Sequence, residues 1–172
     1  MNIGLEQSEH PVAGAIRRRL QSDFGNTTVE RLVLQYGSPF VGIGRPKGYR
    51  LRAEKRCYNN SFSLADTGHG DARRGVYVEG FALHGDHLFQ HAWVTPDGRY
   101  AIDVTLRWPA SEIHFFGIPF SHKILLSEAC SRGFPLLDYG YPKESEAVLQ
   151  KAVASPPEYA SNADQGSSLA MK

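Results

Sequence analysis

Apolar and polar residues alternate in three short runs between residues 77 and 105, and glycine-containing turns separate the runs. The turns are residues 84–86 (His-Gly-Asp) and 96–98 (Pro-Asp-Gly). Alternation with a period of two indicates strands whose successive side chains face opposite sides of a sheet. Three-residue loops with glycine are typical of hairpins. The pattern therefore predicts a three-stranded antiparallel meander.

The predicted loop lengths also determine which residues face one another across the sheet. If residues 95 and 99 flank the second loop as a pair, His91 lies opposite Asp103; if residues 83 and 87 flank the first, Glu79 lies opposite His91. Directly opposed residues share a face, with Cβ atoms about 4.5–5.5 Å apart. We therefore expect an acid–base row of Glu79, His91 and Asp103. The other face then collects an apolar row: Val78, Ala82, Leu88, Ala92, Val94, Ile102 and Val104.

Helical spacing and turn residues predict the remaining elements. Helices are expected over residues 10–24, 28–35, from 57 onward, 121–132 and 143–153, and further strands over residues 40–43 and 113–120. The Gly-Ile-Pro sequence near the end of the last strand favours a sheet edge or a strand that ends in a turn. These elements form one α+β domain over residues 1–154, and the composition of residues 155–172 is typical of a disordered tail.

Cys57 stands at the predicted start of a helix, after the basic residues Lys55 and Arg56. The positive end of a helix dipole and nearby cations favour a thiolate over a thiol, which makes Cys57 a candidate nucleophile. A buried structural cysteine is the alternative. For Cys130, within residues 121–132, packing on the buried side of a helix is the expectation.

Composition narrows the class of protein. The 172 residues are 41% hydrophobic and 22% charged, with a formal net charge of +1, so no global charge draws the chain to nucleic acid or to a membrane surface. No apolar run reaches the length of a membrane span, and the N-terminal residues lack a secretory signal pattern. We expect a cytoplasmic protein, with delivery outside the cell without a cleaved signal left open. Two cysteines are too few for a disulfide framework.

The order Cys57, His91, Asp103 resembles the papain-like superfold, and most closely its transglutaminase-like branch. Residues 91–94 (HAWV) and 103–105 (DVT) are similar to that branch's HAW and DxT blocks, with the cysteine upstream at a helix start. Residues 57–61 (CYNNS), 77–80 (YVEG) and 116–120 (FGIPF) also resemble a group of uncharacterised bacterial and phage proteins. The resemblance spans about residues 50 to 120, and it implies N-terminal helices with the nucleophile helix packed on an antiparallel sheet.

The chemistry that the resemblance implies is covalent acyl transfer through a thioester. Cys57 is then the nucleophile, His91 the general base and acid, and Asp103 the group that orients the imidazole. No cofactor or metal is expected, although a zinc site from the same three side chains is a minor alternative. A second oxyanion donor is needed besides the Cys57 backbone N–H, and Gln35 or Asn60 is the candidate. Four residues are expected to bind substrate or to support the triad: Glu79, Asn60, Trp93 and Gln35.

Three classes of function follow, and the substrate is not determined. The first expectation is a cysteine hydrolase, namely a peptidase, amidase or deamidase, that acts on an amide bond of a protein or peptide. An acyltransferase of transglutaminase type needs the same triad, with a groove that admits an amine. An inactive binding protein on the same scaffold is the third, with its basic residues 17–19 and 50–56 as contacts. Nucleic acid and membrane are not expected partners, and the oligomeric state is open.

Overall fold

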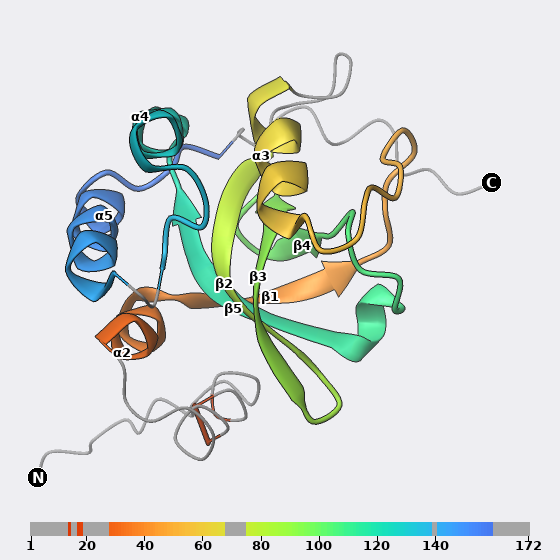
Figure 1. Ribbon diagram of the computed structural model, residues 1–172. Helices are drawn as coiled ribbons and strands as arrows, with labels where there is room; N and C mark the ends of the chain where they lie inside the picture. The colour runs from red at the N-terminus through yellow and green to blue at the C-terminus, as the bar shows by residue number, and fades with distance from the viewer. Residues whose placement is uncertain (1–13, 15–16, 19–27, 68–74, 139–140, 160–172) are drawn as a thin grey trace, which may run out of the picture.

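The computed structural model describes residues 14, 17–18, 28–67, 75–138 and 141–159. Within these ranges the α+β class is confirmed, with four α-helices and a five-stranded sheet (Figure 1). In chain order the elements are α2 (Thr28–Tyr36), β1 (Ser38–Ile43), α3 (Cys57–Thr67), β2 (Val76–His84), β3 (His87–Thr95), β4 (Tyr100–Ile102), a 3₁₀ turn (Ala110–Glu112), β5 (Ile113–Phe120), α4 (His122–Arg132) and α5 (Pro142–Ala154).

Each element predicted within the described ranges is present, including the helix that begins at Cys57. Most of the predicted helix over residues 10–24 lies outside the described residues, as does the predicted tail beyond residue 159. Residues 155–159 carry no helix or strand, and Tyr159 lies against Gly98. None of the described helices is long and apolar enough to cross a bilayer.

The five strands close into a barrel in the order β1-β4-β3-β2-β5. Neighbouring strands are antiparallel except β1 and β4, which run parallel. Strand β5 pairs with both β2 and β1, so the first of the two alternatives for this strand, a sheet edge, is wrong. The strand ends at Phe120, and a single residue separates it from α4. Closure gives each of these five strands two neighbours, so no strand of the described ranges has a free edge.

Two apolar clusters fill the molecule, one on each face of the curved sheet. A smaller cluster receives side chains from all five strands and fills the barrel: Phe40, Val78, Ala82, Trp93, Ala101, Ile113 and Phe115. The larger cluster joins the outer face to the helices. Figure 1 shows α3 over β3 and β2, with α2, α4 and α5 gathered to one side of it. The outer face therefore carries helices in two separate places.

The turn between β2 and β3 is one residue shorter than predicted. His84 pairs with His87 around Gly85 and Asp86, and Gly85 has φ 55°, a conformation that glycine adopts without a steric penalty. Glu79 therefore pairs with Ala92 instead of His91, and the expected row of Glu79 and His91 is wrong. A one-residue slip moves a side chain to the other face of the sheet. The predicted apolar row divides for the same reason, with Val78 and Ala82 inside the barrel and Ala92 on the outer face.

The register between β3 and β4 differs from the prediction by two residues. A shift of two leaves each side chain on the side of the sheet that was predicted for it. Val94 pairs with Ile102, so Asp103 lies diagonally from His91 and on the same side of the sheet. The loop is longer because Asp97 Oδ1 accepts hydrogen bonds from the backbone N–H groups of Arg99 (2.9 Å) and Tyr100 (3.1 Å). The predicted association of His91 with Asp103 therefore survives an error in loop length.

A close approach between β2 and β5 generates a test of the barrel. A Cβ atom on Gly80 would lie 2.2 Å from the Phe116 carbonyl oxygen and 2.4 Å from Gly117 Cα. Because both contacts are backbone atoms, Gly80→Ala must displace a strand, and we expect a loss of about 3 kcal/mol in the free energy of unfolding. Gly44→Ala is the control, because a Cβ there meets nothing within 4 Å. Equal urea midpoints for the two variants would contradict this packing.

Candidate active site

Cys57 is the first residue of α3 and is half-buried. Two polar side chains one turn further on anchor the helix. Asn60 Nδ2 donates to the Ala53 carbonyl oxygen (2.7 Å) and to Thr105 Oγ1 (3.0 Å), and Ser61 Oγ donates to the Ala92 carbonyl oxygen (2.9 Å). These bonds join the start of α3 to the residue next to His91 and to the turn that follows Asp103.

Asn60 is therefore a support for the helix. Both protons of its side-chain amide are engaged, and its side chain is buried. A buried amide with its protons already bound has none left for a substrate oxyanion. The geometry favours a positioning function for Asn60 over the oxyanion function expected from sequence.

The His91 ring is buried, with 2% of the residue exposed, and aromatic rings surround it. Phe89 meets it edge-on at 5.7 Å between centroids, and Trp93 lies nearly parallel to it at 6.4 Å. Nε2 hydrogen-bonds to Asp103 Oδ2. The Cys57 side chain is near enough to raise the pKa of the same ring, and Nδ1 is the ring nitrogen that Asp103 leaves available to it. One imidazole thus lies between a thiol group and a carboxylate.

Asp103 is held from two directions and is 7% exposed. Oδ2 contacts His91, while Oδ1 accepts hydrogen bonds from the backbone N–H groups of Thr105 (2.6 Å) and Leu106 (2.7 Å). The chain turns just after β4, and the turn presents these two donors to the carboxylate. The orientation of Asp103 is therefore set by its own local backbone.

The electrostatics of the pair follow from this geometry. Burial by itself lowers the pKa of His91, but hydrogen bonds and charge from Asp103 and Cys57 outweigh it and raise the pKa to about 9. For Asp103, burial acts to raise the pKa, and His91 together with the two backbone N–H groups outweighs it, so the pKa is lowered. Both effects favour an ionised pair, imidazolium beside carboxylate.

Glu79 is buried on the outer face, where its carboxylate binds a loop instead of His91. It accepts hydrogen bonds from the Tyr77 hydroxyl (2.5 Å) and from the backbone N–H groups of Leu136 (2.8 Å) and Leu137 (2.9 Å). Burial raises the pKa of Glu79, and these bonds offset part of that shift. Asp103, and not Glu79, is therefore the carboxylate that orients His91.

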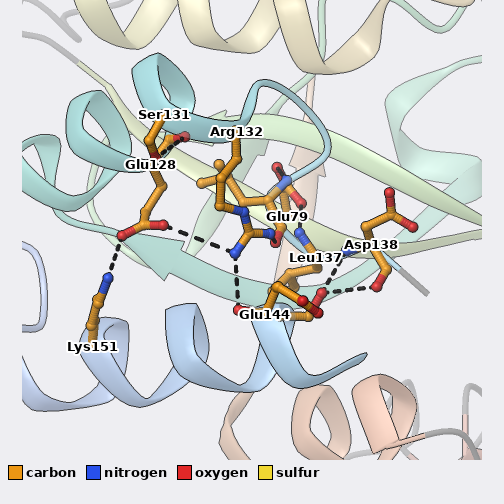
Figure 2. A network of polar contacts seen from close by, with 10 residues as sticks. Glu79, Glu128, Ser131, Arg132, Leu137, Asp138, Glu144 and Lys151 are labelled. Carbon is orange, nitrogen blue, oxygen red and sulfur yellow. Dashed lines mark hydrogen bonds and ion pairs between the residues drawn. The ribbon is translucent and has the colours of Figure 1, made fainter. Parts of the chain in front are cut away.

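A network of polar contacts secures the same loop from α4 and α5 (Figure 2). Arg132 donates to the carbonyl oxygens of Leu136 (3.1 Å) and Glu144 (2.9 Å). Buried Glu128 binds Lys151 at 2.6 Å. Ser145 Oγ binds both the N–H and the carbonyl oxygen of Asp138, at 2.8 Å each. The loop between α4 and α5 is thus tied to β2 and to both helices.

The other expected site residues lie further from the reacting groups. Gln35 is exposed in the last turn of α2, a helix that packs on α5 and β5. Trp93 is fully buried among Phe40, His91 and Phe115, so it supports the His91 ring from inside the barrel. No three His, Cys, Asp or Glu side chains of the described ranges are arranged to hold a metal ion, which leaves the zinc alternative without a donor set there.

Cys130 is exposed, so the expectation that its thiol packs on the buried side of α4 is wrong. The buried side of that helix carries Ile124, Leu125 and Glu128. The apolar pattern did not place Glu128 in the interior. Its carboxylate can be buried there because Lys151 pairs with it. The chain therefore has one half-buried cysteine at a helix start and one exposed cysteine near a helix end.

Two hollows border the candidate site. A cavity of about 10 Å³ is lined by Val33, Tyr58, Glu79, Gly80, Gln90, His91 and Leu137. A hollow of about 290 Å³ borders Asp103, with Arg45, Arg107 and Trp108 among its walls. A third hollow, of about 430 Å³, lies around the start of α4 and is lined by none of Cys57, His91 and Asp103.

Sequence reasoning missed the residues that line the small cavity. Tyr58 and Gln90 each neighbour a predicted triad residue in the chain, which is a signal that was available. Val33 and Leu137 come from α2 and from the loop after α4, and no local pattern connects them to Cys57. Only the folded chain brings them to His91.

The Glu79 contacts predict a cost in stability. Glu79→Ala leaves three buried donors unpaired, and we expect the free energy of unfolding to fall by about 3 kcal/mol. Glu79→Gln retains an acceptor oxygen and should lose about half as much. Glu158→Ala, a change at an exposed carboxylate, should lie within about 0.5 kcal/mol of the parent protein. Urea denaturation measures all three, and a Glu79→Ala variant as stable as Glu158→Ala would contradict the network.

The His91 pKa predicts a pH dependence. Because the folded-state pKa of about 9 exceeds the ordinary 6.5, His91 stabilises the fold fully below pH 6.5, and this contribution is lost as pH rises through 9. NMR titration of the imidazole should give a midpoint near pH 9. In Asp103→Asn the midpoint should move to lower pH. Burial lowers the His91 pKa, and without the aspartate only Cys57 still acts to raise it. His91→Asn assigns the resonance, and a parent midpoint at or below 6.5 would refute the buried ion pair.

Comparison of the chain with protein-family models, with curated proteins and with solved structures finds no match. The resemblance to the transglutaminase-like branch therefore rests on the sequence motifs alone.

Proposed function

We propose that this protein is a cysteine hydrolase that cleaves an amide bond of a protein or peptide through a thioester intermediate. The observation that carries the proposal is the buried imidazole of His91, bound to Asp103 on one side and to Cys57 on the other. A thiol is activated for acyl transfer when a base lies next to it and a carboxylate orients that base. The same arrangement is expected in the transglutaminase-like branch that the sequence resembles.

In the first step, the Cys57 thiolate attacks the carbonyl carbon of the substrate amide. The developing oxyanion accepts a hydrogen bond from the Cys57 backbone N–H, since the first N–H groups of a helix have no partner within it. His91, protonated at neutral pH because of its raised pKa, donates its proton to the leaving nitrogen. The C–N bond breaks, and a thioester on Cys57 and a neutral His91 remain.

Asp103 contributes by holding the ring. Its bond to Nε2 keeps that nitrogen protonated and turns Nδ1 toward Cys57. Because Thr105 and Leu106 fix the carboxylate, the imidazole cannot rotate without breaking hydrogen bonds. Rigid placement of the base is worth a large rate factor, since a misplaced catalytic group costs about 10²-fold.

Thiol reactivity tests the nucleophile without knowledge of the substrate. At pH 7, iodoacetamide should modify Cys57 about tenfold faster than Cys130. Mass spectrometry of the two cysteine-containing peptides measures both rates. Cys130 is a stringent reference because it is exposed whereas Cys57 is half-buried. His91→Ala should remove the difference. If Cys57 reacts no faster than Cys130, the catalytic proposal fails and an inactive binding protein is the better description.

Acylation by p-nitrophenyl acetate tests the mechanism. We expect release of p-nitrophenol with an acetyl group on Cys57, and none of this in Cys57→Ala. His91→Ala should abolish turnover, and Asp103→Asn should slow it by about 10²-fold or more, because the ring loses its orienting partner. Circular dichroism should show that each variant keeps the parent fold. Comparable turnover in Cys57→Ala would rule out the mechanism.

A further inference from the structure

The segment that leads from β1 to Cys57 concentrates positive charge beside the candidate site. Residues 44–56 contain six cations and one carboxylate, a net charge of +5, whereas the whole chain carries +1. Five of these cations are exposed: Arg45, Lys47, Arg50, Lys55 and Arg56. Among the described residues, none of the five has an ion-pair partner. Their charge is therefore available to a ligand.

Hydrogen bonds fix this segment against the residues around the candidate triad. The Arg52 backbone N–H donates to the Val104 carbonyl oxygen (2.7 Å), directly after Asp103 in the chain. The Arg52 guanidinium donates to the Asn60 carbonyl oxygen (3.3 Å), in the first turn of α3. Lys55 has φ 58°, a left-handed conformation that a residue with a side chain keeps only where its surroundings hold it. The cations therefore have a defined place near the nucleophile.

The hollow of about 290 Å³ lies on the same side of the sheet as the His91 ring. Its wall residue Ile113 belongs to the apolar cluster that fills the barrel, and the His91 ring lies against Trp93 of that cluster. Asp103, which is bound to His91, forms another wall. The width of the imidazole therefore separates the Asp103 wall of this hollow from Cys57.

Two cations line the hollow, and one of them joins it to the segment before the nucleophile. Arg45 is exposed at one wall. Arg107 donates through Nε to Glu54, three residues before Cys57, which leaves its other N–H groups for a ligand. An extended peptide advances about 3.3–3.6 Å per residue. A peptide bound at Cys57 can therefore reach the hollow with a side chain about two or three residues from the amide that is attacked.

These cations suit the carboxylates of a peptide better than a nucleic acid. Guanidinium groups bind a carboxylate through two parallel hydrogen bonds. Single-stranded nucleic acid requires exposed aromatic faces as well as cations. Tyr49, the one aromatic residue of the segment, is half-buried, and Trp108 at the hollow already stacks on His84 at 4.2 Å between centroids. The proposed reaction also requires an amide bond in the substrate.

We infer that residues 44–56 and Arg107 form a binding surface for acidic peptides, and that the substrate carries Asp or Glu side chains close to the amide that Cys57 attacks. This assignment of the substrate rests on the proposed function. One carboxylate of the peptide enters the hollow lined by Arg45 and Arg107, and others contact the exposed cations before Cys57. The attraction increases affinity and the rate of encounter, and salt weakens it.

Alkylation by a charged reagent tests the surface without a substrate. The ratio of the rates with iodoacetate and iodoacetamide should be about fivefold higher at Cys57 than at Cys130, because cations attract the anionic reagent. Protonated His91 attracts iodoacetate too, so substitution of a cation decides the cause. Arg56→Gln should lower the ratio at Cys57 about twofold, whereas Lys143→Gln, an exposed cation at the start of α5, should leave it unchanged. An equal ratio in the parent protein and Arg56→Gln would overturn the inference.

Binding to Cys57→Ala, which lacks the nucleophile, identifies the class of ligand. The probes are acetylated and amidated tetrapeptides of glutamate, glutamine or lysine, and pentathymidylate, which carries the same charge as tetraglutamate. Tryptophan fluorescence provides the signal, since Trp108 lines the hollow and is the exposed one of the two tryptophans. Tetraglutamate should bind about tenfold more tightly than tetraglutamine, and tetralysine more weakly than either. Adding Arg45→Gln should remove most of this preference, whereas adding Lys143→Gln should preserve it.

The outcomes separate this inference from the proposed function. If p-nitrophenyl acetate acylates Cys57 but tetraglutamate binds no more tightly than tetraglutamine, the inference alone is overturned. Tighter binding of pentathymidylate than of tetraglutamate would assign the surface to nucleic acid and overturn it as well. If tetraglutamate is preferred but Cys57 is never acylated, the acidic-peptide surface is supported and the hydrolase proposal fails.

Discussion

The buried imidazole of His91 is the constraint on which the rest of the site depends. An ionisable ring that is almost fully buried is costly unless its nitrogen atoms are bound. Asp103 and Cys57 provide that binding, and each is fixed by a different part of the fold. Asp103 is held by the turn after β4, and Cys57 by a helix that Asn60 and Ser61 attach to the barrel. A change in either support therefore reaches the same ring.

A second buried carboxylate performs a different task on the outer face. Glu79 binds the loop between α4 and α5, and that loop carries Leu137 to the cavity beside His91. The polar network of α4 and α5 thus fixes the position of Leu137 beside His91, although the network itself does not contact the reacting groups. The three hydrogen bonds that the Glu79 oxygens accept offset the free-energy cost of burying this carboxyl group.

The errors in the sequence-based register have a common physical cause. The turn residues are predicted correctly, but the loop lengths are not. Two residues, Gly85 and Asp86, lie between the paired residues His84 and His87 where three were expected, and seven lie between the paired residues Val94 and Ile102, two more than the predicted register allows. A shift of one residue transferred Glu79 to the other face, whereas a shift of two left Asp103 beside His91. The barrel closure through β1 and β5 was likewise missed, because pairing between distant strands leaves no local pattern in the sequence.

By itself, the sequence determined the secondary structure of the described ranges, the α+β class and the helix that begins at Cys57, because periodicity, caps and turn residues act over a few positions. It also identified His91 and Asp103 as partners, since alternation requires only that their faces agree. Tertiary structure decided which carboxylate binds His91, which cysteine is exposed, and how Val33, Tyr58, Gln90 and Leu137 enclose a cavity. Those outcomes depend on packing between elements far apart in the chain, for which a single sequence carries no local signal.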